Sequence, residues 1–107
     1  MIRTIYNLTV ILVVVSYCVV QAADNCFIND SGFTCCNKEL EKAMKTAMKG
    51  TDLLGSADSI QKSAEKTLGG KFETVVALDD FAYKSHFKEG KTCKIEKDGQ
   101  YALAWQP

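Results

Sequence analysis

The sequence predicts a small α+β domain in which two antiparallel helices pack on a small antiparallel sheet of three or four strands, with two disulfides. Three observations lead to this fold class. Apolar residues recur at three- and four-residue steps in two central segments of the chain. They alternate with polar residues in the segments that follow. Four cysteines remain once an N-terminal apolar segment is set aside.

The first 22 residues have the features of a secretory signal peptide. A single cation, Arg3, precedes an apolar run that extends from Leu8 to Val20. This run is short for a helix that spans about 30 Å of hydrocarbon. Val20 and Ala22 place small side chains at positions −3 and −1 of a peptidase site. We therefore expect cleavage after Ala22, secretion, and no insertion of the mature chain into a membrane; a single-pass signal anchor is the alternative.

The mature chain has room for one domain. Removal of 22 of the 107 residues leaves 85, divided into a short lead (residues 23–33) and a domain (residues 34–107). A chain of this length buries little apolar surface and gains from covalent bridges. The lead contains Asn29-Asp30-Ser31, a candidate N-glycosylation sequon.

The first predicted helix begins after Thr34, a plausible N-cap, and ends at Gly50. One face of this helix is apolar and the opposite face carries lysines and glutamates, as is typical of a helix that packs on a core with one side. The apolar stripe of this helix consists of Cys36, Leu40, Ala43, Met44, Ala47 and Met48.

The second predicted helix covers residues 56–68. Its apolar stripe is formed by Ile60, Ala64 and Leu68, and Gly69-Gly70 is a strong signal for its end. Its start is open, because Ser56 is a plausible N-cap and Asp58 has the spacing of a capping box. The link from the first helix is short, which predicts an antiparallel pair.

Strands are predicted after the helices. Residues 72–78 are rich in β-branched and aromatic side chains, and residues 81–84 form a second strand or extended segment. Asp98-Gly99 lies between residues 92–96 and 100–105, which alternate in polarity, and this pattern predicts a hairpin. Its last strand places Tyr101, Leu103 and Trp105 on one face.

Cysteines supply the covalent bridges. Cys18 leaves with the signal peptide, so Cys26, Cys35, Cys36 and Cys93 remain for two disulfides in an oxidising compartment. A bridge between the neighbours Cys35 and Cys36 would be strained. If both residues are helical, Cys36 faces the sheet and Cys35 faces solvent. We therefore expect Cys36–Cys93 and Cys26–Cys35; the exchanged pairing, Cys26–Cys36 with Cys35–Cys93, is the alternative, since helix ends are hard to place.

Composition and motifs exclude several function classes. Lys plus Arg number 13 and Asp plus Glu number 13, and the predicted mature chain has no arginine for bidentate phosphate contacts. No basic block indicates a nucleic-acid groove. Zinc-knuckle and phosphate-loop spacings are missing. His86, the single histidine, lies in a polar segment near Ser85 and Asp79-Asp80, an arrangement more typical of an exposed loop than of a hydrolase. We expect no enzyme, cofactor, metal or nucleic acid.

The remaining expectation is a binding surface. The aromatic residues least needed for the core are Phe81, Tyr83 and Phe87, which we take as candidate partner contacts. The alternative interpretation is that Phe81 and Tyr83 pack against the sheet.

A set of short motifs in residues 34–105 resembles a known family. These motifs are Cys35-Cys36-Asn37, Leu40, Met44, Ile60-Gln61, Ala64-Glu65, residues 72–76, Asp80-Phe81-Ala82-Tyr83-Lys84, Cys93-Lys94 and Tyr101-Ala102-Leu103-Ala104. Together they resemble the ground-like domain, a family of secreted nematode proteins related to the Hedgehog-like group. The resemblance implies an extracellular signalling or matrix-associated module that binds and modulates Patched-like membrane receptors. We expect this module to be a monomer. A structural component of extracellular matrix or cuticle is the alternative.

Overall fold

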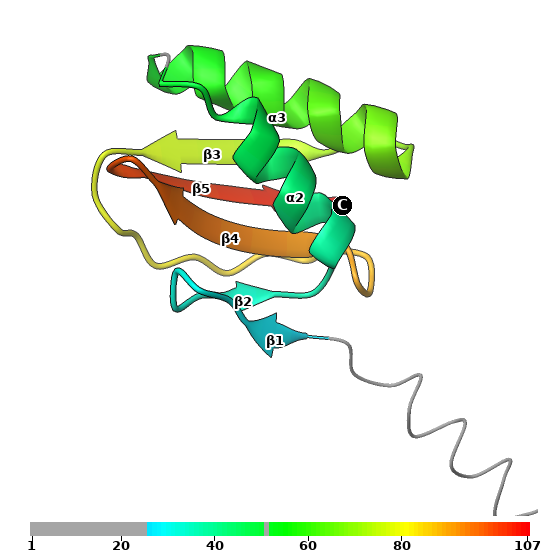
Figure 1. Cartoon of the computed structure of the whole chain (residues 1–107). Coiled ribbons are helices and arrows are strands. Elements are labelled where there is room, and N and C mark those ends of the chain that lie inside the picture. The colour runs from blue at the N-terminus through cyan, green and yellow to red at the C-terminus, as the bar shows by residue number, and fades with distance from the viewer. Residues whose placement is uncertain (1–25, 51) are drawn as a thin grey trace, which may run out of the picture.

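The computed structural model describes residues 26–50 and 52–107, and they form two layers (Figure 1). Helices α2 and α3 cover one face of a five-stranded antiparallel sheet of order β1-β2-β4-β5-β3. The predicted α+β class is confirmed. The helices and strands are α2 (Lys38–Ala47), α3 (Leu53–Leu68), β1 (Phe27–Ile28), β2 (Thr34–Cys35), β3 (Glu73–Ala77), β4 (Thr92–Lys97) and β5 (Gln100–Trp105).

The expected signal peptide, residues 1–22, lies outside the described residues, and so does Cys18. Within the part of the chain that the structure describes, no helix is both long enough and apolar enough to cross a membrane.

The core lies between the two helices and the sheet. Burying this apolar surface is the main force that holds such layers together. Phe72, just before β3, is the largest side chain that is fully buried. The buried cluster consists of Cys35, Leu40, Met44, Met48, Ile60, Ala64, Phe72, Cys93, Ile95, Ala102 and Ala104.

The start of α2 differs from the expectation. Asn37 is the N-cap, and its side-chain oxygen accepts a hydrogen bond of 3.0 Å from the backbone N–H of Leu40. The helix therefore begins at Lys38, four residues beyond the predicted cap Thr34. The reason is that Thr34 and Cys35 form strand β2. Their side chains alternate between the two faces of the sheet, where the sequence pattern indicated a helix.

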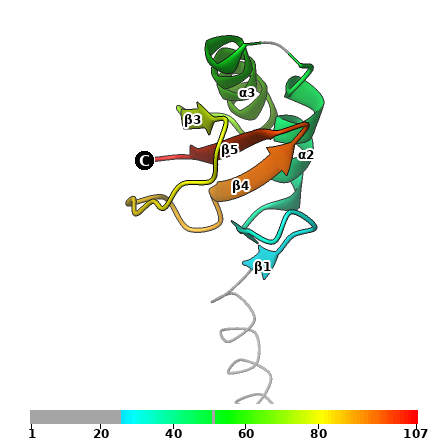
Figure 2. The ribbon, with the colours of Figure 1, turned by 90° about the vertical axis from the view of Figure 1, so that its left-hand side faces the viewer.

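The end of α2 is held by a side chain from the sheet. The ammonium of Lys97 donates to the carbonyls of Lys45 and Met48 at 2.7 and 2.8 Å. These carbonyls belong to the last turn, where helical partners are missing. The link to α3 is short, and α2 runs across α3 rather than alongside it (Figures 1 and 2).

The second helix ends where the sequence predicts and begins earlier. Gly69 is its C-cap with a φ of 78°, which suits glycine. Asp52 is its N-cap, and its carboxylate accepts from the N–H of Gly55 at 2.6 Å. Neither Ser56 nor Asp58 serves as the cap, because α3 begins at Leu53, and Ser56 is fully buried.

The strands after α3 are confirmed, with one exception. The β4–β5 hairpin turns at Asp98 and Gly99, whose φ values of 52° and 81° fit the predicted Asp-Gly turn. β3 pairs with β5 along its whole length. Residues 81–84 form no strand and belong instead to an irregular segment between β3 and β4. The short strands β1 and β2 were missed.

The disulfide pairing is the exchanged alternative, and the preferred pairing is wrong. Cys35 is bonded to Cys93 and Cys26 to Cys36. Cys35 lies directly opposite Cys93 in the β2–β4 register, on the side that faces the helices. Because neighbouring residues of an extended chain point to opposite sides, Cys36 is directed away from Cys93. The error follows from treating Cys35 and Cys36 as helical.

Candidate functional site

The face of the sheet opposite the helices is covered by the chain between β3 and β4. We call residues 78–91 the covering segment; it lies on the far side of the sheet from α2 and α3 (Figure 2). Side chains alternate across a strand, and Cys93 and Ile95 of β4 belong to the core on the helix side. Lys94, between them, therefore points toward the covering segment.

Lys94 fixes the first part of the covering segment to β4. Its residue is only 4% exposed. Its ammonium bonds to the carboxylate of Asp80 and donates to the carbonyl of Phe81 at 2.6 Å. It also lies 4.2, 4.3 and 5.7 Å from the ring centroids of Phe33, Phe81 and Tyr83. A buried ammonium is stable only with such partners, and the ring faces supply cation–π attraction.

The contact with Lys94 lowers the pKa of the Asp80 carboxyl group. Asp80 itself is largely exposed, and its pKa is lowered, chiefly by the hydrogen bond from Lys94 and further by the backbone N–H of Phe81. That N–H donates to the Asp80 carboxylate at 2.7 Å. Asp80 is therefore ionised at neutral pH, and the Asp80–Lys94 contact is a charged hydrogen bond.

The other end of the covering segment is fixed by backbone hydrogen bonds. Lys88 donates its N–H to the carbonyl of Gln106 at 2.7 Å, and Gln106 donates to the carbonyl of Lys91 at 2.9 Å. Lys91 in turn donates to the carbonyl of Lys88 at 2.9 Å. The segment is thus held at both ends, although it is neither helix nor strand.

The three predicted contact residues fall into two groups. Phe81 is partly buried, and its ring covers the Lys94 ammonium, so the packing interpretation fits it. Tyr83 and Phe87 are 38% and 41% exposed. Tyr83 contacts Phe81 edge to face, with 6.4 Å between ring centroids, and its partial burial raises the pKa of its phenol. Of the three predicted contact residues, Tyr83 and Phe87 are the two that present large apolar surface to a partner.

Two aliphatic residues extend this exposed surface. Val75 pairs with Leu103, which in turn pairs with Lys94, so all three lie on the outer face of the sheet. Val75 is 42% exposed, and Leu78, the first residue of the covering segment, is 65% exposed. We call Val75, Leu78, Tyr83 and Phe87 the outer apolar residues.

Sequence reasoning missed Lys94 and Phe33. One signal was present: a lysine between Cys93 and Ile95 must point away from the core if the strand alternates. Nothing in the sequence indicated that Phe33, 61 positions earlier, would lie against the same ammonium. That contact requires β2 to be placed beside β4.

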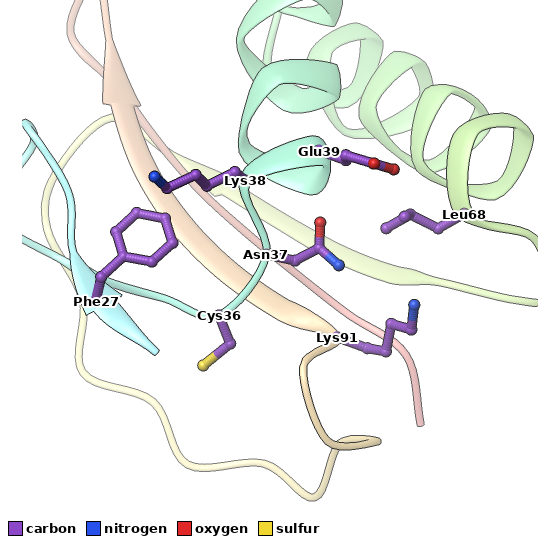
Figure 3. A pocket seen from close by; sticks show the side chains of 7 residues that line it. All are labelled: Phe27, Cys36, Asn37, Lys38, Glu39, Leu68 and Lys91. Atoms are coloured by element: carbon purple, nitrogen blue, oxygen red, sulfur yellow. The ribbon is translucent and has the colours of Figure 1, made fainter. Parts of the chain in front are cut away.

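A separate hollow lies beside the start of α2 (Figure 3). It is open to solvent, has a volume of about 470 Å³, and mixes charged with apolar walls. In Figure 3 the Lys38 side chain extends toward Phe27, and its ammonium is 5.8 Å from the ring centroid. The predicted contact residues do not line it. Its lining consists of Phe27, Cys36, Asn37, Lys38, Glu39, Leu68 and Lys91.

Potential metal and hydrolytic groups are placed unfavourably among the described residues. Donor atoms of Cys35, Glu41 and Cys93 lie within 4.8 Å of one another, but both sulfurs are consumed by the disulfide. The hydroxyl of Ser85 is buried and has no hydrogen-bond partner in the described chain, so it is not bonded to His86.

Comparison with known families gives one match. The model of the Ground-like domain family matches residues 32–105. The matched range contains Phe33, Lys94 and the whole covering segment, and it excludes Cys26. No curated protein matches the chain.

Proposed function

Because the chain belongs to the ground-like domain family, we propose that it is a secreted, non-catalytic module that binds and modulates a Patched-like membrane receptor. The observation that supports this most directly is the covering segment, which carries exposed aromatic side chains and is fixed to the sheet through a buried lysine. The receptor class comes from the family resemblance, and the contact surface comes from the geometry of the outer face.

Rigid presentation is the physical reason to assign binding to this surface. Lys94 and the backbone bonds at Gln106 fix the covering segment before any partner arrives. A partner therefore avoids much of the entropy loss that ordering a loop would require. Large side chains such as Tyr and Phe supply much of the binding energy at protein interfaces. Tyr83 and Phe87 have both the size and the exposure for this role.

The two disulfides support a role outside the cell. Disulfides persist in oxidising compartments and are rare in the cytosol. In a domain this small they stabilise a fold whose core is limited. Secretion would follow from removal of residues 1–22.

A structural role in matrix or cuticle is the second candidate. The exposure of Cys26 favours it, since an accessible bridge can exchange with other proteins. This role would leave the protein in insoluble material that only a reductant releases. The receptor-binding role predicts a soluble product that attaches reversibly to cells.

The test is binding of the purified protein to cells that express a Patched-like receptor, compared with the parental cells. The Tyr83→Ser, Phe87→Ser double variant should bind at least tenfold more weakly. Leu54→Ser is the matched control, because Leu54 is 79% exposed on α3, in the helical layer. It should bind like the wild type. Equal binding to both cell lines, or an unchanged affinity of the double variant, would contradict the proposal.

A further inference from the structure

The two disulfides differ in their access to solvent. Cys35 and Cys93 are both 0% exposed and belong to the core cluster. Cys26 is exposed, and its partner Cys36 is 4% exposed. A thiol dissolved in water can therefore approach the Cys26–Cys36 bridge from the Cys26 side, whereas the Cys35–Cys93 bridge is shielded by the helices and the sheet.

The segment that the exposed bridge closes has other attachments to the sheet. The side chain of Asn29 donates to the carbonyl of Lys94 at 2.8 Å. The hydroxyl of Ser31 accepts from the N–H of Glu96 at 3.1 Å and donates to its carbonyl at 3.3 Å. These bonds join the β1–β2 turn to the outer edge of β4 without using either sulfur of the exposed bridge.

The second bridge also keeps β2 in place. Cys35 remains bonded to Cys93, and the N–H of Cys36 donates to the carbonyl of Thr92 at 2.8 Å. Opening the Cys26–Cys36 bridge therefore leaves the sheet, the core and the covering segment connected as before. What changes is the covalent bond between Cys26 and Cys36 alone.

We propose that the Cys26–Cys36 bridge is a thiol-exchange site through which the domain is joined to a partner protein by a mixed disulfide at Cys26. The co-reactant is a thiolate of that partner. It attacks the sulfur of Cys26, the bond between Cys26 and Cys36 breaks, and its electron pair stays on the sulfur of Cys36, which then takes a proton. One disulfide is lost and one is formed, so no external oxidant is required.

The position of Cys26 suits such a linkage. It lies outside residues 32–105, the range that matches the family, whereas Cys36 lies inside. Cys36 is only 4% exposed at the wall of the hollow, whereas Cys26 is exposed, so Cys26 is the more accessible of the two to an incoming thiolate. The new bond would lie beyond β1, at the end of the sheet order opposite β3. It would leave the outer apolar residues accessible, so the inference does not depend on the proposed receptor.

Glutathione is the probe that tests this inference. The purified, oxidised full chain is incubated with reduced glutathione under native conditions, and free thiols are then alkylated with N-ethylmaleimide. Fragment-ion mass spectra distinguish Cys35 from its neighbour Cys36. We expect one glutathione on Cys26, the alkyl group on Cys36, and an intact Cys35–Cys93 bridge. Adduct formation should be at least tenfold faster than any loss of the Cys35–Cys93 bridge.

The matched control is the Cys26→Ser, Cys36→Ser double variant. It should keep the circular dichroism spectrum of the wild type, retain the Cys35–Cys93 bridge and take up no glutathione. Glutathione on Cys36 rather than Cys26, equal rates for the two bridges, or no adduct on Cys26 in the folded protein would overturn the inference. A double variant that fails to fold would also overturn the inference, because the mixed-disulfide form must remain folded without the Cys26–Cys36 bridge.

Discussion

Cys35 of β2 lies directly opposite Cys93 of β4, and the disulfide between them joins two residues that are 58 positions apart in the chain. Both sulfurs belong to the buried cluster beneath the helices. This bridge ties the N-terminal strands to the C-terminal hairpin, whereas the Cys26–Cys36 bridge spans only 10 positions.

The two bridges should differ in their contribution to stability. Loop-closure entropy predicts a loss of about 4 kcal/mol for the long bridge and about 3 kcal/mol for the short one. Such a domain has a total stability of about 5–10 kcal/mol, so loss of the long bridge leaves a margin as small as about 1 kcal/mol, and Cys35→Ser, Cys93→Ser should accumulate in the culture medium at a much lower level. Cys26→Ser, Cys36→Ser should still be recovered folded. Recovery is measured by immunoblot of the medium. Equal recovery of the two double variants would show that the long bridge does not stabilise the fold more than the short one.

Lys94→Met tests the fixation of the covering segment. The substitution keeps much of the side-chain volume but removes the ammonium from Asp80, the Phe81 carbonyl and the rings. We expect the free energy of unfolding in urea to fall by about 2 kcal/mol. Lys62→Met is the control, since its pair with Asp58 lies on the exposed helix surface, where solvent screens the charges and ion pairs add little to stability. A similar small effect for both variants would mean that Lys94 does not fix the segment.

The Asp80–Lys94 contact should make stability depend on pH. Lys94 lowers the pKa of Asp80 below its unfolded value of about 3.9. The contribution of this carboxylate is therefore fully present above that value and is lost as the pH falls through the lower folded pKa. Urea midpoints of the wild type and Asp80→Asn should differ at pH 7, and the difference should shrink progressively as the pH falls below about 4. A difference that stays constant down to pH 2 would exclude this carboxylate as the source.

Gly70→Ala tests a close approach at the end of α3. Gly70 has a φ of 75°, and a Cβ there would collide with the side-chain amide of Gln106, which donates to the carbonyl of Gly69 at 3.0 Å. Gly50→Ala is the matched control, with a φ of 72° and open space around the added carbon. Both variants carry backbone strain, but Gly70→Ala should lose about 1 kcal/mol more of unfolding free energy than Gly50→Ala. Its melting temperature should therefore be lower than that of Gly50→Ala. Equal shifts would indicate that Gln106 moves aside freely.

Local signals made much of the fold predictable. Gly69 marked the end of α3, and Asp98-Gly99 marked the β4–β5 turn, because positive φ values favour these residues. The two-residue strands β1 and β2 were not predictable, since so short a strand has no periodicity. β1 pairs only with β2, and the position of β2 beside β4 depends on a disulfide and on side chains distant in sequence. Because β2 was not recognised, the predicted start of α2 was too early and the predicted disulfide pairing was the wrong one.

The candidate site was predictable only in part. Composition was enough to select Tyr83 and Phe87, which are exposed, together with Phe81, which covers Lys94. The role of Lys94 required knowledge of where the covering segment crosses the sheet. No local pattern contains that information, since Asp80 and Lys94 are 14 positions apart and meet only in the tertiary structure.

Hydrogen–deuterium exchange of the whole protein, alone and with the purified ectodomain of a Patched-like receptor, tests receptor binding most directly. The proposed surface predicts slower exchange of the backbone amides in residues 78–91 when the receptor is present, with little change in α2 and α3. Protection confined to the helices, or no protection at saturating receptor, would contradict the assignment of binding to the outer face.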